Sequence, residues 1–193
     1  MAATELTGAP TRRTGGRLPR GLPVDWLAAY TTVWVATLAE AALVAAAGQP
    51  AISLTRCALR LGLTGQRNPP PHLGHIVALA AHNIPIGAWP LLLGLMGADR
   101  GRLARHLGDS AVLASILANT LPVGAALAAY GTPLIAYLPQ LPLEWAGLAL
   151  GASSWLTQRR RALTARERLV WLALISGVLL CAAVLETAAV PHR

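Results

Sequence analysis

The sequence is poor in charged residues, and it contains neither lysine nor phenylalanine. Charged residues make up 12% of its 193 residues, whereas a typical soluble domain carries about 25%. This shortage excludes a soluble globule with a solvated surface, and the 54% of hydrophobic residues excludes disorder for most of the chain. The two cysteines, Cys57 and Cys181, lie far apart and show neither a disulfide nor a metal-binding spacing.

Long hydrophobic segments are what the sequence does contain. A helix needs about 20 mostly apolar residues to cross the hydrocarbon core of a bilayer. Five segments reach this length, at residues 24–47, 76–97, 111–130, 133–156 and 169–189. We therefore predict an all-α, multi-pass protein of the bacterial plasma membrane, in which residues 23–193 form one domain of five transmembrane helices. Prolines in the second, third and fourth segments predict kinks or local breaks there.

Two flanking segments differ from the spans in composition. Residues 1–22 are rich in Gly, Thr, Pro and Arg, which predicts a disordered basic tail. Residues 48–75 form the longest connection between spans. Within it Leu54, Ala58 and Leu61 share one helical face, while Arg56 and Arg60 share another. This pattern predicts a short interfacial helix on the outer surface of the membrane.

The distribution of the arginines predicts the orientation of the chain. Of the 16 arginines, 12 fall in the N-terminal tail and in the connections after the second and fourth spans. The positive-inside rule then places the N-terminus in the cytoplasm and the C-terminus outside. This grouping also replaces nucleic-acid binding as the explanation of the net charge of +8. Trp26, Trp155 and Trp171 fall at the predicted cytoplasmic ends of their spans, as in an aromatic belt.

Polar residues inside the spans are the candidate functional residues. A charge placed at the centre of a bilayer costs about 2.5–3.5 kcal/mol on insertion scales, so such residues are rare and often functional. The candidates for binding a partner or ligand are Glu40, His82, Asn83, Asn119, Gln140, Glu144 and Glu186. With the N-terminus inside, all but Asn119 are predicted to lie in one layer, about 5 to 16 Å below the outer interface.

This layer has two interpretations. It forms either an outward-facing polar cavity or partner-binding seam, or a set of interhelical hydrogen bonds worth about 0.6 kcal/mol each. For His82 with Glu144, a structural pair and a functional site remain open. The sequence shows no metal-binding spacing, phosphate loop, nucleophile elbow or catalytic carboxylate pair. We therefore predict no metal, no cofactor and no enzymatic activity.

Four short segments together resemble the stage II sporulation protein M family. They are Ala81-His82-Asn83-Ile84, Asn119 with Gly124, the run from Leu138 to Glu144, and Val184-Leu185-Glu186 followed by Pro191. The chain departs from the family pattern at Thr120 and Leu141, where relatives often carry glycine. The resemblance implies an integral membrane protein of five helices. In spore-forming bacteria the family resembles a membrane scaffold for cell-wall hydrolases, and relatives occur beside bacteriocin export and immunity genes.

These features predict a non-enzymatic membrane scaffold. Its partners are expected to be the lipid bilayer and other membrane or envelope proteins, but not nucleic acid. The alternative is a membrane subunit of a transport, export or immunity system, with the outward-facing polar cavity as its pathway. An intramembrane enzyme that uses His82 and Glu144 is the weakest alternative, because one His and one Glu on different helices are common by chance.

Overall fold

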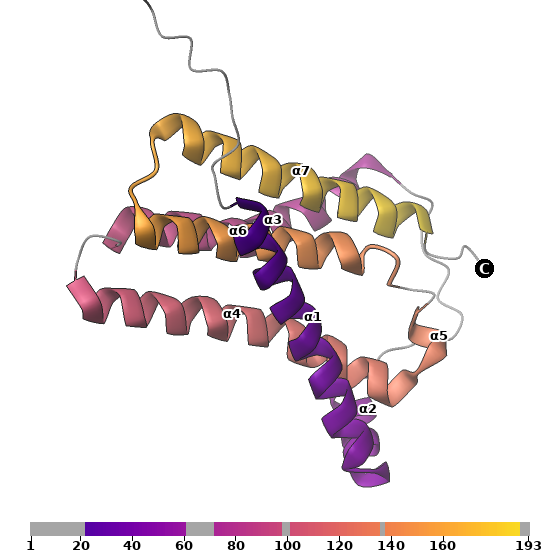
Figure 1. Cartoon of the computed structure of the whole chain (residues 1–193). Coiled ribbons are helices and arrows are strands. Elements are labelled where there is room, and N and C mark those ends of the chain that lie inside the picture. The colour runs from indigo at the N-terminus through magenta and orange to yellow at the C-terminus, as the bar shows by residue number, and fades with distance from the viewer. Residues whose placement is uncertain (1–21, 61–71, 98–100, 136–137, 190–193) are drawn as a thin grey trace, which may run out of the picture.

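The computed structural model describes residues 22–60, 72–97, 101–135 and 138–189, and every regular element in these ranges is helical. The elements, shown in Figure 1, are α1 (Leu22–Ala46), α2 (Gln49–Leu59), α3 (Leu73–Gly97), α4 (Gly101–Tyr130), α5 (Thr132–Ile135), α6 (Leu141–Arg160) and α7 (Ala165–Ala189). The predicted all-α class is therefore confirmed for this part of the chain. The predicted tail falls almost wholly outside the described residues, as do Leu61 and Pro191.

Four of the helices are long and apolar enough to cross a membrane. These segments are Val24–Ala46 in α1, Leu73–Leu95 in α3, Gly101–Tyr130 in α4 and Ala165–Ala188 in α7. They correspond to the first, second, third and fifth predicted spans, although α4 starts at Gly101 rather than at residue 111. Both α3 and α4 continue through their prolines, so the local breaks predicted there are not found.

The predicted fourth span is the exception. The segment 133–156 divides into the short α5 and the longer α6, with a turn at Pro139 and Gln140. Pro142 stands in the first turn of α6, where the missing backbone N–H costs no helical hydrogen bond. By composition α6 is not among the four candidate spans, because it carries Ser153, Ser154 and Gln158 in its middle and end.

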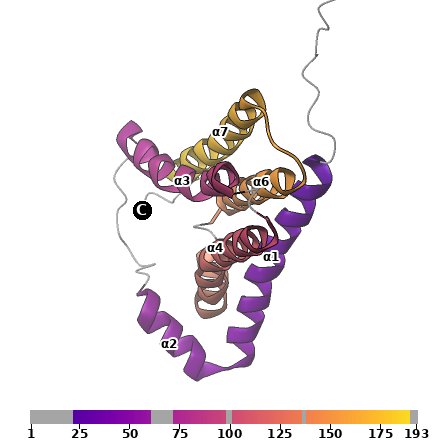
Figure 2. The same cartoon turned by 90° about the vertical axis from the view of Figure 1, so that its left-hand side faces the viewer.

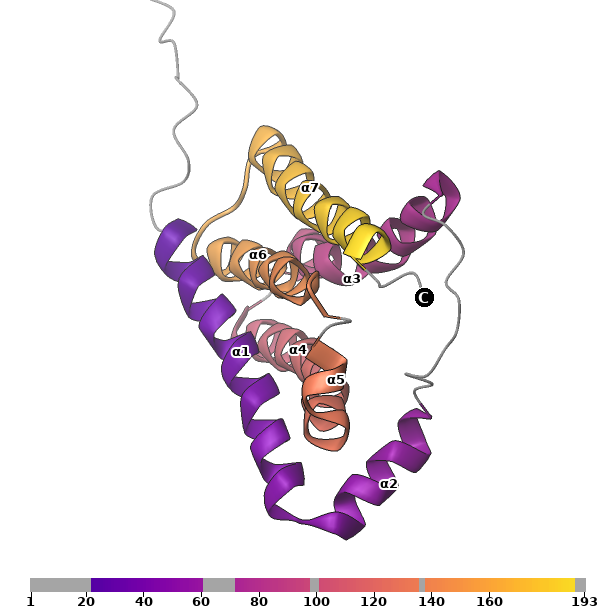
Figure 3. The ribbon, with the colours of Figure 1, turned by 90° about the vertical axis from the view of Figure 1, so that its right-hand side faces the viewer.

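Helix α6 lies at the centre of the bundle. It packs against α1, α3 and α7, and the views along the bundle show α4 on its remaining side (Figure 2 and Figure 3). Most of its residues from Trp145 to Trp155 are buried, including both serines. The least apolar of the long helices thus lies among more apolar ones, which suits a bilayer, where the least apolar surface has to face other helices.

Two close helix contacts, of α6 with α3 and of α4 with α1, depend on glycine. A Cβ atom added at Gly151 would overlap the carbonyl oxygen of Gly87 on α3, and one at Gly124 of α4 would overlap the carbonyl oxygen of Thr37 on α1. Small residues at such positions let helix backbones approach each other, which is how helices pack in membranes. The outer surfaces of α1, α3, α4 and α7 instead carry exposed leucines and valines, such as Val35, Leu92 and Leu113.

A helix, α2, is present where the sequence predicts an interfacial one. It packs against the C-terminal end of α4, where the Arg56 Nε donates a hydrogen bond of 2.7 Å to the carbonyl oxygen of Ala129. This contact satisfies one of the carbonyl groups that the end of a helix leaves without a partner. Leu54, on the other face, is 71% exposed. The apolar face of α2 is thus left uncovered by the described residues, as a helix that rests on lipid requires.

Candidate functional site

Three consecutive arginines at the end of α6 each bind an acidic residue of a different helix. The Arg159 Nη2 lies 3.2 Å from the Asp109 Oδ2 of α4. The Arg160 guanidinium donates two hydrogen bonds, of 2.7 and 3.1 Å, to Asp25 of α1. The Arg161 Nη2 lies 2.7 Å from the Glu167 Oε1 of α7. We call this group the arginine end; it consists of Asp25, Asp109, Arg159, Arg160, Arg161 and Glu167.

Two further contacts extend the arginine end. The Trp155 Nε1 donates a hydrogen bond of 2.9 Å to Asp109, and the Trp155 ring is 2% exposed. At the start of α7, the backbone N–H of Thr164 donates to Glu167 while the Glu167 N–H donates to the Thr164 hydroxyl. This is a capping box, a pattern that Thr164 and Glu167 already carry in the sequence. Glu167 also raises the pKa of Arg161 above its ordinary value through their hydrogen bonds.

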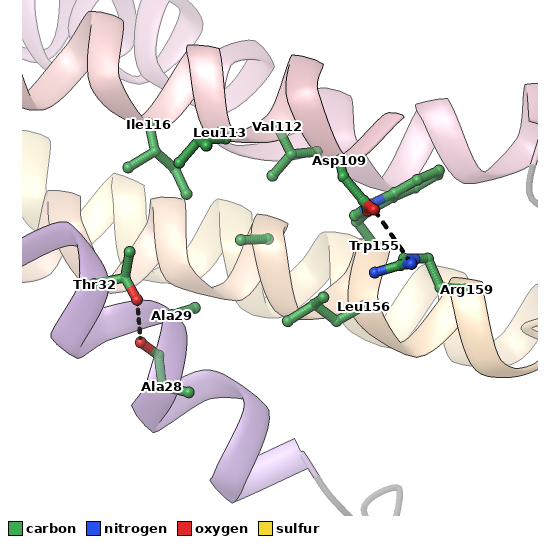
Figure 4. A pocket seen from close by; sticks show the side chains of 11 residues that line it. Ala28, Ala29, Thr32, Asp109, Val112, Leu113, Ile116, Trp155, Leu156 and Arg159 are labelled. Atoms are coloured by element: carbon green, nitrogen blue, oxygen red, sulfur yellow. Dashed lines mark hydrogen bonds and ion pairs between the residues drawn. The ribbon is translucent and has the colours of Figure 1, made fainter. Parts of the chain in front are cut away.

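A cavity of about 270 Å³ opens beside Asp109 and Arg159. Its lining comes from α1, α4 and α6: Ala28, Ala29, Thr32, Asp109, Val112, Leu113, Ile116, Ala152, Trp155, Leu156 and Arg159. Figure 4 shows the paired Asp109 and Arg159 at one end and aliphatic side chains along the rest. The Thr32 hydroxyl donates to the carbonyl oxygen of Ala28 within its own helix. The cavity therefore suits an apolar occupant, such as part of a lipid acyl chain.

Three of the predicted polar residues, but not the predicted layer as a whole, meet at the other end of α6. A small cavity of about 50 Å³ is lined by Asn83 and Gly87 of α3, Asn119 of α4, Glu144 of α6 and apolar side chains, including Leu179 of α7. The Asn83 Nδ2 donates a hydrogen bond of 3.4 Å to the Glu144 Oε1. We call Asn83, Asn119 and Glu144 the amide–carboxylate cluster. Four helices thus contribute to one cavity, three of them through polar residues predicted from the sequence.

The other predicted residues have different surroundings. Glu186 of α7 is half-buried and near enough to Glu144 and to His75 for their charges to interact. Glu40 is half-buried on α1, where its Cβ lies against Gly124 of α4. Gln140 is buried just before α6 begins. None of these residues lines the small cavity.

His82 is exposed, and its neighbour Asn83 makes the contact with Glu144. The structure therefore does not bring together the pair of His82 and Glu144 that the sequence left open. His82 and Asn83 are successive residues of α3 and point about 100° apart, so their side chains cannot both face α6.

Among the described residues, no three His, Cys, Asp or Glu side chains gather into a group that could hold a metal ion. The arginine end is not predicted from the sequence, where its arginines indicate only the orientation of the chain. The chain matches no family model, no curated protein and no solved structure.

Proposed function

We propose that the protein is an integral membrane scaffold of the bacterial plasma membrane, with five transmembrane helices, a cytoplasmic N-terminus and an external C-terminus. The observation that carries this proposal is the position of α6. It is enclosed by α1, α3 and α7, and these helices turn large apolar side chains such as Val35, Leu92 and Leu172 outward. Such a bundle offers its surroundings an apolar surface and keeps its polar residues inside, as an anchor for partners in a bilayer requires.

The directions of the helices support five crossings. Asn83 in the middle of α3 meets Glu144 at the start of α6, while Gln158 near the end of α6 donates to the carbonyl oxygen of Leu91, further along α3. The two helices therefore run parallel, as the second and fourth spans of a five-span topology must. The arginine end then lies on the side of the membrane that the positive-inside rule assigns to the cytoplasm.

The size of the cavity at the amide–carboxylate cluster favours a scaffold over a transporter. A cavity of about 50 Å³ at the amide–carboxylate cluster holds about one water molecule, whose share of liquid volume is about 30 Å³. It is too small for an organic substrate. A membrane subunit of a transport or export system is the second candidate, because polar residues from three helices line that cavity and polar residues in spans often mark ion pathways.

We also propose a relationship to the stage II sporulation protein M family. Three of the four segments that carry the resemblance supply the amide–carboxylate cluster, one residue each: Asn83, Asn119 and Glu144. The fourth supplies Glu186, whose charge interacts with that of Glu144. Segments far apart in the sequence that meet around one cavity support a shared architecture more strongly than four separate matches do.

Cysteine labelling tests the orientation. In a chain with Cys57 and Cys181 replaced by serine, a reagent that cannot cross the membrane should label Ser53→Cys in intact cells but label Ala162→Cys only after lysis. Both positions are exposed in the structure. The reverse pattern would contradict the proposed orientation. Labelling of both positions in intact cells would contradict an odd number of crossings between Ser53 and Ala162.

Photo-crosslinking tests the scaffold role. A crosslinking amino acid at Leu172 or Leu180, both exposed on α7, should join the protein to one defined membrane or envelope partner. The control is Ile175 on the same helix, which is fully buried and should give no adduct. In parallel, vesicles containing the protein should show no solute flux that depends on Glu144. Flux abolished by Glu144→Gln, without any partner adduct, would favour the transport candidate instead.

A further inference from the structure

The carboxylate of Glu144 lacks a described positive partner. Glu144 is mostly enclosed by helices, and no described residue forms a salt bridge with it. Its described hydrogen bond, from the Asn83 amide, is long at 3.4 Å. A carboxylate removed from water is costly unless a positive charge or several donors compensate it. Either a proton or a bound cation has to supply what the protein does not.

The two asparagines are oriented in a way that favours a cation. The Asn83 Nδ2 donates to Glu144, and the Asn119 Nδ2 donates a hydrogen bond of 2.7 Å to the backbone oxygen of Ser115. Each amide therefore already donates a hydrogen bond through its nitrogen, and its carbonyl oxygen remains as an acceptor. No described group donates a hydrogen bond to either amide oxygen or to the second Glu144 oxygen. The three residues that carry these oxygen acceptors line one small cavity, and carboxylate and amide oxygens are the ligands that hard cations prefer.

We propose that Asn83, Asn119 and Glu144 bind a monovalent cation, such as Na⁺, in the cavity between α3, α4 and α6. One carboxylate lines the cavity, so a single positive charge neutralises the site. A volume of about 50 Å³ accommodates a small ion with about one water, because a water needs about 30 Å³. The nearby Glu186 adds negative potential without lining the cavity. The ion joins α4, which packs mainly on α1, to α3 and α6.

This inference goes beyond the scaffold proposal and does not depend on it. The site is defined by three side chains and their hydrogen bonds, whichever partners the bundle binds. Failure of the crosslinking experiment would leave the cation site standing, and absence of cation binding would leave the scaffold standing.

A titration of the purified full-length chain tests the site. The protein is kept in mild detergent at pH 8, and NaCl replaces choline chloride at constant ionic strength. Trp145 lines the cavity, so its fluorescence reports on occupancy. Na⁺ should change the fluorescence saturably and raise the Tm in step with the logarithm of its concentration above Kd. Parallel titrations use KCl and CaCl₂, and a pH series from 6 to 9 is run in choline chloride alone.

Variants locate the effect. Glu144→Gln should abolish the response to Na⁺, and Asn119→Ala should raise the Kd about 10-fold or more, because one ligand oxygen is lost. Glu40→Gln, a span carboxylate outside the cavity, should respond as the wild type does. The proposal is overturned if the wild type gives no saturable response, responds to pH or Ca²⁺ alone, or responds equally in Glu144→Gln. If Glu144→Gln cannot be purified, an unchanged Kd in Asn119→Ala overturns it.

Discussion

The two ends of α6 differ in whether their acidic residues form salt bridges. At the arginine end, Asp25, Asp109 and Glu167 each bind an arginine of the chain. At the other end, Glu144 and the nearby Glu186 form no salt bridge with any described residue. The first end is held together by charges that the protein supplies itself. The second end has an acidic side chain without a positive partner among the described residues, and the proposed cation site rests on this difference.

Geometry explains why one short run of arginines can reach three helices. Consecutive residues of a helix point about 100° apart, so Arg159 and Arg160 in the last turn of α6 point towards α4 and α1. Arg161 follows the helix in an extended conformation and reaches Glu167 of α7. The C-terminal end of a helix also carries partial negative charge, which favours arginine there. The positive-inside rule uses these arginines to predict the orientation of the chain, and the structure shows the same residues joining helices.

The largest effect is expected from Trp155, which connects the arginine end to the core. Its ring is buried and its Nε1 donates to Asp109. Trp155→Ala should lower the free energy of unfolding by about 3–5 kcal/mol, as the loss of a buried large side chain does. Unfolding of the purified protein by SDS in mixed micelles measures this change. The partly buried Trp34 is the control, and an equal loss in Trp34→Ala would show that Trp155 has no special place.

The apolar helices were accessible to sequence analysis, whereas their central member was not. Hydropathy alone identifies the candidate spans in α1, α3, α4 and α7, because a surface that faces lipid has to be apolar. Helix α6 faces other helices, so its composition follows packing instead, and the predicted span 133–156 merged it with α5. The tryptophans show the same limit: Trp155 and Trp171 are buried in the bundle rather than placed in a belt at the interface.

The cluster was predicted in part for a similar reason. A cost for polar residues in spans selects Asn83, Asn119 and Glu144 from the sequence alone. Whether His82 or its neighbour Asn83 faces inward depends on the rotation of α3 about its axis. In the structure Asn83 contacts Glu144 and His82 is exposed. The pairing of Asp25 with Arg160 could not be predicted, since it joins opposite parts of the chain and depends on how α1 crosses the bundle.

The next effect tests whether charge stabilises the arginine end. Asp25 is only 9% exposed and accepts two hydrogen bonds from Arg160. Asp25→Asn should lower the free energy of unfolding by about 1–3 kcal/mol, the range for hydrogen bonds between charged groups. The same SDS unfolding assay measures it. Removing the other partner in Arg160→Gln should give a similar loss, and the double variant should lose less than the sum of both.

Neutralising an acid at the opposite end should have the opposite sign. In choline chloride without Na⁺, Glu144→Gln should raise the free energy of unfolding by about 1 kcal/mol, because an uncompensated carboxylate no longer has to leave water. The same unfolding assay at pH 8 compares this variant with Asp25→Asn. A loss of stability in Glu144→Gln under these conditions would mean that both ends depend on their acids alike, and the contrast between them would fail.

The smallest effect is expected for the outermost pair of the arginine end. The Glu167 side chain is 28% exposed, against 12% for Asp25, so water and salt screen the attraction between Arg161 and Glu167 more strongly, and exposed pairs contribute about 0.2–1 kcal/mol. Arg161→Gln should therefore cost less than Arg160→Gln in the same assay, and its effect should shrink as the salt concentration rises. Glu167 also caps α7 through Thr164, so Glu167→Gln should keep the cap that Glu167→Ala loses. A cost in Arg161→Gln as large as in Arg160→Gln would mean that burial of the acid does not determine how strongly each arginine joins its helix.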